Sequence, residues 1–150
     1  MNISENIKKI HEEVTTWRHE LHANPELCYE ENWTAEFITE KLKSFGIEVH
    51  NKIGKTGVIG VLKGSNSQEH KSNRSIGLRA DMDALPIEEE NDFDYKSKFL
   101  GKMHACGHDG HVAMLLGAAK ILSKEKKFSG TVYFIFQPAE EGGGGGLKMI

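Results

Sequence analysis

The chain has 150 residues, of which 38% are hydrophobic and 27% charged, a composition that predicts one folded domain and excludes a largely disordered chain. The net charge of -3 is spread along the chain, and the Lys-rich stretch 124–127 has the character of a solvated helix end, so we expect no nucleic-acid partner. A secretory signal and a long apolar run are both missing from the sequence, which predicts a cytoplasmic protein without a membrane partner.

The first part of the chain has the periodicity of two helices. Apolar residues at helical spacing follow Ser4, a plausible helix cap, and the pattern stops at Asn24-Pro25. A second helix is expected from about Thr34 to Gly46, where glycine can adopt the left-handed conformation that ends helices.

The remaining chain alternates between strands and helices. Strands are expected at 47–50, 57–62, 75–80 and 131–136, and the last is apolar enough to be covered on both faces. A helix should start near Asp109, and residues 64–74 and 87–103 should form loops. This alternation predicts an α/β layer fold.

The last residues, 147–150, begin a new amphipathic pattern. We expect this pattern to continue in a longer protein, although a short terminal helix that frays is the alternative.

Three polar segments follow predicted strands or precede a predicted helix, where open α/β sheets place their ligands. They are residues 81–86 (DMDALP), 103–111 (MHACGHDGH) and 137–142 (QPAEEG).

In the second segment a glycine separates Cys106 from His108, so a thiol and an imidazole can face the same ion. The helix that follows should favour the thiolate through its N-terminal charge. Thiolate with imidazole suits zinc, while imidazole with carboxylate also serves manganese, cobalt or nickel. A buried cysteine beside a helix-capping turn explains the same pattern.

In the third segment Glu140 and Glu141 are adjacent, and neighbouring residues of an extended chain point to opposite sides. One carboxylate can therefore bind a metal while the other faces a metal-bound water. An exposed glutamate pair is the alternative. The five glycines 142–146 that follow either leave backbone amides accessible to a substrate or form a flexible linker.

Asp83 in the first segment either orients a ligand imidazole or forms a turn before Pro86. We leave His104 and His111 out of the metal ligands, because a helix-surface or hydrogen-bonded core histidine is the commoner role.

Together the three segments resemble the aminoacylase/carboxypeptidase metallohydrolase family, in the branch of hippurate hydrolases, indole-acetyl-amino-acid hydrolases and N-acetyldiaminopimelate deacetylases. Residues 17–22 (WRHELH) and 24–27 (NPEL) also resemble the opening of that branch.

The resemblance implies a zinc-peptidase-like catalytic domain with a central mixed sheet flanked by helices. Residues 1–150 would be its N-terminal part, and a lid or dimerisation domain would lie outside this chain. Cys106, His108 and Glu141 match the metal ligands, Glu140 matches the general base, and Asp83 matches the aspartate of the His-x-Asp motif. Asp81 stands where many relatives have a metal-binding histidine, and Cys106 would be the metal ligand that compensates for the missing histidine.

We therefore predict a metal-dependent amidohydrolase that cleaves N-acyl amino acids or related small amides and forms a homo-oligomer when full length. The complete site would hold one or two divalent ions, zinc or manganese, with cobalt or nickel as alternatives. The 150-residue chain alone is expected to be inactive. A noncatalytic metal-binding or interaction module and an aminopeptidase that acts on short peptides are the alternative functions.

Overall fold

The computed structural model describes residues 5–65 and 74–150 of the chain. Ser4, the predicted cap, and residues 66–73 of the first predicted loop lie outside these ranges. The elements are, in chain order, α1 (Glu5–Ala23), α2 (Asn32–Ser44), β1 (Glu48–Ile53), β2 (Gly57–Lys63), β3 (Ser75–Asp81), α4 (His108–Glu125), β4 (Thr131–Gln137) and α5 (Gly145–Met149). No helix among the described residues is long and apolar enough to cross a membrane.

The second helix begins two residues earlier than predicted because a side chain outside it caps its first turn. The Glu26 carboxylate accepts hydrogen bonds from the backbone N–H groups of Trp33 and Thr34, at 3.1 and 2.8 Å. These donors have no partner within a helix, so an external acceptor stabilises this start.

The strands form one mixed sheet, as predicted, and their order in it is β1-β2-β4-β3. β2 is antiparallel to β1 and to β4, whereas β3 is parallel to β4. The parallel pair is connected through α4, which makes a βαβ unit of the second half of the chain.

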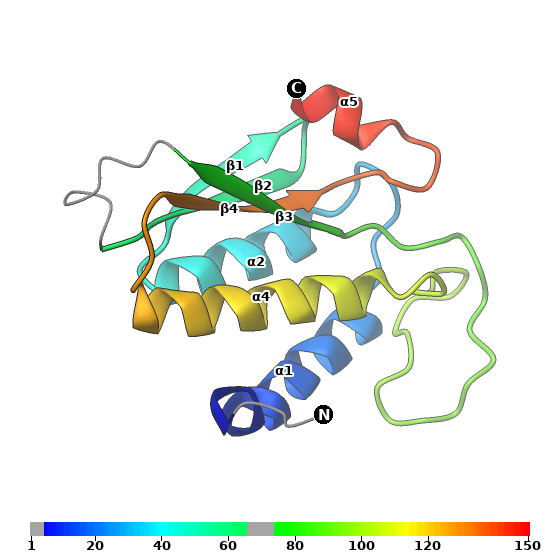
Figure 1. Cartoon of the computed structure of the whole chain (residues 1–150). Helices are drawn as coiled ribbons and strands as arrows, with labels where there is room; N and C mark the ends of the chain where they lie inside the picture. Colours follow the sequence, from blue (N-terminus) through cyan, green and yellow to red (C-terminus); the bar gives the residue numbers. More distant parts are fainter. Residues whose placement is uncertain (1–4, 66–73) are drawn as a thin grey trace.

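Three layers are visible in Figure 1, where α2 and α4 lie against one face of the sheet and α1 packs on the far side of α4. The apolar core between sheet and helices includes Phe134, Phe136, Leu116 and Val58, which are fully buried.

The prediction that the last strand is covered on both faces is wrong for the described residues. Val132, Phe134 and Phe136 of β4 are buried, but Tyr133 between them is 39% exposed. The helices cover only the face to which the buried residues point, so β4 has the alternation of a half-buried strand.

Residues 87–103 form the predicted loop. Its two ends are tied together by reciprocal backbone hydrogen bonds of 3.0 Å between Leu85 and Met103. This bridge fixes where the chain leaves β3 and where it returns to α4.

Candidate metal centre

The topology brings the three polar segments together where the parallel strands β3 and β4 end, and we call this end of the strands one edge of the sheet. In the parallel pair, Asp81 at the end of β3 lies opposite Gln137 at the end of β4. The crossover helix α4 runs back along the sheet, so its first residue, His108, lies at the same edge (Figure 1). Segments that are far apart in the sequence therefore meet because both strand ends and one helix start share this edge.

His108 is the centre of the arrangement, with a side chain only 2% exposed. Its Nδ1 lies 2.8 Å from the backbone carbonyl oxygen of Asp83, which can only accept, so Nδ1 carries a proton. The other nitrogen, Nε2, faces three carboxylate oxygens: Asp81 Oδ1 at 3.6 Å, Glu141 Oε1 at 3.8 Å and Glu140 Oε2 at 3.9 Å.

The charge around His108 favours a cation. Burial alone would lower the pKa of the imidazole, but hydrogen bonding to Asp83 and the charge of Asp81 outweigh burial and raise it. A divalent cation beside Nε2 would balance the negative charge of these carboxylates, as a proton on Nε2 does. It would also be bound by the lone pair of that nitrogen.

One group of candidate metal ligands is the predicted one. The ligand atoms of Cys106, His108 and Glu141 all lie within 4.8 Å of one another. Sulfur, nitrogen and oxygen donors in one place fit a borderline-soft ion such as zinc. The structure thus brings together the residues for which metal binding was predicted, and their role as ligands stays a prediction.

The Cys106 thiol does not show the expected effect of the helix start. A hydrogen bond to Glu141 comes first among the causes that raise the pKa of the thiol, followed by burial and the Glu140 and Asp81 charges. Several negative charges outweigh the partial positive charge of one helix N-terminus. Cys106 is therefore a thiol until a cation replaces its proton.

Glu140 and Glu141 do not point to opposite sides of an extended chain, as the sequence led us to expect. Both carboxylates face Nε2 of His108, at 3.9 and 3.8 Å. The segment is a turn, because Ala139 has a φ of 48° and the N–H of Gly142 donates to the carbonyl of Glu140 over 2.7 Å. The side chain of Glu140 is 40% exposed and that of Glu141 25%.

A buried carboxylate, that of Glu31, stabilises this turn through a hydrogen bond to its backbone. Glu31, fully buried, accepts a hydrogen bond of 2.8 Å from the backbone N–H of Ala139 and one of 2.6 Å from the Thr56 hydroxyl. The left-handed backbone of Ala139 is costly for a residue with a side chain. Glu31 helps to offset that cost, and no periodicity in the sequence indicated this role.

Asp83, predicted either to orient an imidazole or to form a turn, contacts both sides of the site. Its backbone carbonyl accepts from His108, and its Oδ2 accepts from the N–H of Glu141 at 2.9 Å. Burial would raise the pKa of Asp83, but the hydrogen bonds from His108 and Glu141 outweigh burial and hold the pKa well below its usual range. Its functional role stays a prediction.

Cys28 also contacts Asp83, which the sequence did not indicate. Its thiol is half-buried and donates to Oδ2 of Asp83 over 3.1 Å. Burial and the Asp83 carboxylate raise the pKa of Cys28 to about 11, so it remains a hydrogen-bond donor.

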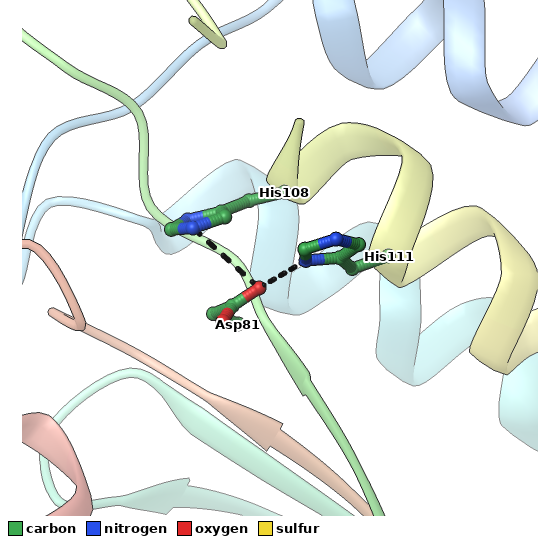
Figure 2. Close-up of side chains that lie close together, drawn as sticks. All are labelled: Asp81, His108 and His111. Carbon is green, nitrogen blue, oxygen red and sulfur yellow. Dashed lines mark hydrogen bonds and ion pairs between the residues drawn. The ribbon is translucent and has the colours of Figure 1, made fainter. Parts of the chain in front are cut away.

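A second group of candidate ligands contains a histidine that we left out. Figure 2 shows the Asp81 carboxylate between the rings of His108 and His111, and the ligand atoms of the three residues lie within 4.8 Å of one another. Asp81 Oδ1 accepts from Nδ1 of His111 at 2.6 Å. Burial would raise the pKa of Asp81, but this bond and the His108 charge lower it. The i, i+3 spacing of the two histidines was the available signal.

His104 stays outside both groups, as expected, but it has no hydrogen-bonded role in the core either. Both ring nitrogens are buried, and no described residue is a hydrogen-bond partner for them. Burial lowers the pKa of His104 to about 4. Nearby, His22 bridges Asp109 and Glu89 at 2.7 and 3.0 Å and thereby links α1, the start of α4 and the loop 87–103.

Residues 142–144 of the five-glycine run precede α5, and the last two glycines are the first residues of that helix. A Cβ on Gly145 would lie 1.7 Å from the carbonyl oxygen of Pro138, and one on Gly143 would lie 2.6 Å from Cβ of Ala139. Close packing against the Glu140 turn therefore requires glycine at these two positions. The accessibility of their amides to a substrate stays a prediction.

The chain is similar in sequence to one known family of peptidases. Residues 77–150 match the family model of Peptidase family M20/M25/M40. The resemblance predicted from the three motifs is thus confirmed.

Two curated relatives are similar to this chain along its whole length. The chain is 51% identical over 150 residues to hippurate hydrolase of Campylobacter jejuni and 48% identical over 157 residues to thermostable carboxypeptidase 2 of Saccharolobus solfataricus. Both alignments cover 100% of this chain but only 38% and 39% of the relatives, so the chain spans well under half of their length.

A solved structure shows the same fold. A Bacillus subtilis protein described as a dinuclear metal-binding peptidase of the M20 family superposes with a TM-score of 0.86 and 41% identity, over 94% of this chain and 38% of that one. The predicted zinc-peptidase-like catalytic fold is therefore confirmed.

Proposed function

We propose that the protein containing this chain is a metal-dependent amidohydrolase that cleaves N-acyl amino acids or related small amides. The observation that carries the proposal is the convergence of a thiol, an imidazole and two carboxylates at one edge of the sheet. The 51% identity to a hippurate hydrolase supports an amide of an amino acid as the substrate, since hippurate is such a compound.

Cys106, His108 and Glu141 would hold the divalent ion. Three protein ligands leave an open position, as catalytic zinc sites do. Zinc or manganese is the proposed ion, with cobalt and nickel as alternatives, and the complete site would hold one or two. The bound ion would supply a Lewis acid and make water acidic enough to lose a proton near neutral pH.

Glu140 would be the general base. Its carboxylate is the more exposed of the two glutamates and faces the same imidazole nitrogen as Glu141. In the reaction, Glu140 accepts a proton from the attacking water as the bond from oxygen to the acyl carbon forms. It then gives that proton to the leaving nitrogen as the carbon–nitrogen bond breaks. Asp83 would orient His108 through the hydrogen bond to Nδ1.

We propose that residues 1–150 form the N-terminal part of the catalytic domain and that the remainder, including a lid or dimerisation domain, belongs to a longer protein. The support is that the alignments cover 38% and 39% of the relatives. On this basis the 150-residue chain alone should show little or no turnover, and the full-length enzyme would be a homo-oligomer.

The test is Glu140→Gln in the full-length protein, with Glu12→Gln on the exposed side of α1 as the control. Loss of a general base should lower turnover of N-acyl amino acids by about 10²–10⁴-fold, while the metal content stays at the wild-type level. Turnover equal to that of the control would refute the role of Glu140. In the unmodified full-length protein, hydrolysis of short peptides but not of N-acyl amino acids would favour the peptidase alternative. In that same protein, intact metal binding without any hydrolysis would favour the noncatalytic module.

A further inference from the structure

The second group of candidate ligands has the geometry of a cation site of its own. Asp81 Oδ1 lies 2.6 Å from Nδ1 of His111 and 3.6 Å from Nε2 of His108. Atoms that bind one ion at about 2.0–2.2 Å lie roughly 3–3.5 Å apart, so small side-chain movements would bring all three into position. The other oxygen of Asp81 is held by Arg79 at 3.3 Å, which leaves Oδ1 directed between the two rings (Figure 2).

Both groups of ligands depend on the same atom. The proton on Nδ1 of His108 is engaged by the Asp83 carbonyl, so Nε2 is the only nitrogen of this ring that can bind an ion. The Cys106–Glu141 pair and the Asp81–His111 pair both require that nitrogen. One lone pair binds one ion, and the two sites therefore exclude each other.

We propose that Asp81, His108 and His111 form a second cation site, which takes a hard divalent ion such as Mn²⁺ and competes with the thiolate site for His108. The inference goes beyond the proposed reaction and shares only His108 with its metal site. A carboxylate and two imidazoles make a harder donor set than one that includes a thiolate, so manganese gains relatively more from the Asp81 site and zinc from the Cys106 site.

Binding at the second site requires one rearrangement. Nδ1 of His111 donates to Asp81 in the described structure, and this atom must lose its proton before it can bind an ion. A neutral imidazole can carry its proton on Nε2 instead. The side chain of His111 is 47% exposed, so water can accept the relocated N–H.

The experiment measures the affinity of the full-length protein for Mn²⁺ by electron paramagnetic resonance of free Mn²⁺. Its affinity for Zn²⁺ is measured by competition. Two variants change one site each: His111→Ala and Cys106→Ser, both at exposed positions, with folding checked by circular dichroism. The exposed His11 on α1 provides the control variant, His11→Ala.

The proposal predicts opposite effects of the two variants. His111→Ala should weaken Mn²⁺ binding at least about tenfold and leave Zn²⁺ binding unchanged, since loss of even an outer-shell partner of a metal typically costs that much. Cys106→Ser should weaken Zn²⁺ binding and leave the Mn²⁺ binding that depends on His111 unchanged. In the unmodified protein, Zn²⁺ should displace, one for one, the Mn²⁺ whose binding depends on His111.

Two results would overturn the inference: Mn²⁺ affinity that does not depend on His111, or Mn²⁺ binding that does depend on His111 but persists when zinc saturates the Cys106 site. Zinc affinity that does not depend on Cys106 would instead contradict the metal site of the proposed function. The two failures are thus distinguishable.

Discussion

Replacement of His104 by leucine should stabilise the protein most at acidic pH. The imidazole is 5% exposed, and both its nitrogens are buried without a partner among the described residues. Burial lowers its pKa to about 4, whereas the unfolded chain has the ordinary value of about 6.5. Between these values the unfolded state binds more protons than the folded state, so His104 makes the free energy of unfolding fall as the pH falls.

The size of the effect follows from the two pKa values. At about pH 5 an unfolded His104 is almost fully protonated and a folded one almost fully neutral, which amounts to a loss of about 2 kcal/mol of stability relative to about pH 8. The leucine variant lacks this loss. Its advantage over the wild type should therefore be about 2 kcal/mol larger at about pH 5 than at about pH 8, whatever its packing contributes at both pH values.

The assay is urea unfolding followed by the fluorescence of Trp17 and Trp33, for wild type and variant at both pH values. His11→Gln controls for the loss of an exposed histidine. An equal difference in unfolding free energy at the two pH values would show that His104 is not held neutral by burial, and the reasoning would fail.

Two further changes test the support of the Glu140 turn. Glu31→Ala removes a buried acceptor of two hydrogen bonds, one of them from Ala139, and should lower the free energy of unfolding by about 3–5 kcal/mol; Glu31→Gln keeps one acceptor and should cost clearly less in the same urea titration. Gly145→Ala places a Cβ 1.7 Å from the Pro138 carbonyl oxygen and should weaken zinc binding by isothermal calorimetry. Gly110→Ala should leave zinc binding intact, because a Cβ added at Gly110 would meet no packing neighbour within 4 Å. Equal stability of the two Glu31 variants, or equal zinc affinity of the two glycine variants, would contradict this account.

The order of elements could be predicted from the sequence because each rests on local information. The period of apolar residues distinguishes the helices α1, α2 and α4 from the strands, and the strand-helix-strand order around residues 75–137 indicates a parallel pair. Metal-competent side chains at the ends of these elements indicated an edge-of-sheet site. These features need no knowledge of which segments touch.

Contacts between distant segments could not be predicted in the same way. The sequence showed Glu140 and Glu141 as neighbours of an extended chain, but the turn at Ala139, stabilised by Glu31 from the start of α2, directs both toward His108. The proximity of Asp81 and His111 likewise depends on how α4 packs beside β3.

The sequence alone determined the class of fold and the chemical types at the site, since both follow from residue spacing and donor atoms. Only the tertiary structure decided that His108 offers one nitrogen to two sets of ligands and that buried carboxylates hold the surrounding turns. Electrostatic effects depend on distance in space and on exclusion of water, and neither is a property of position along the chain.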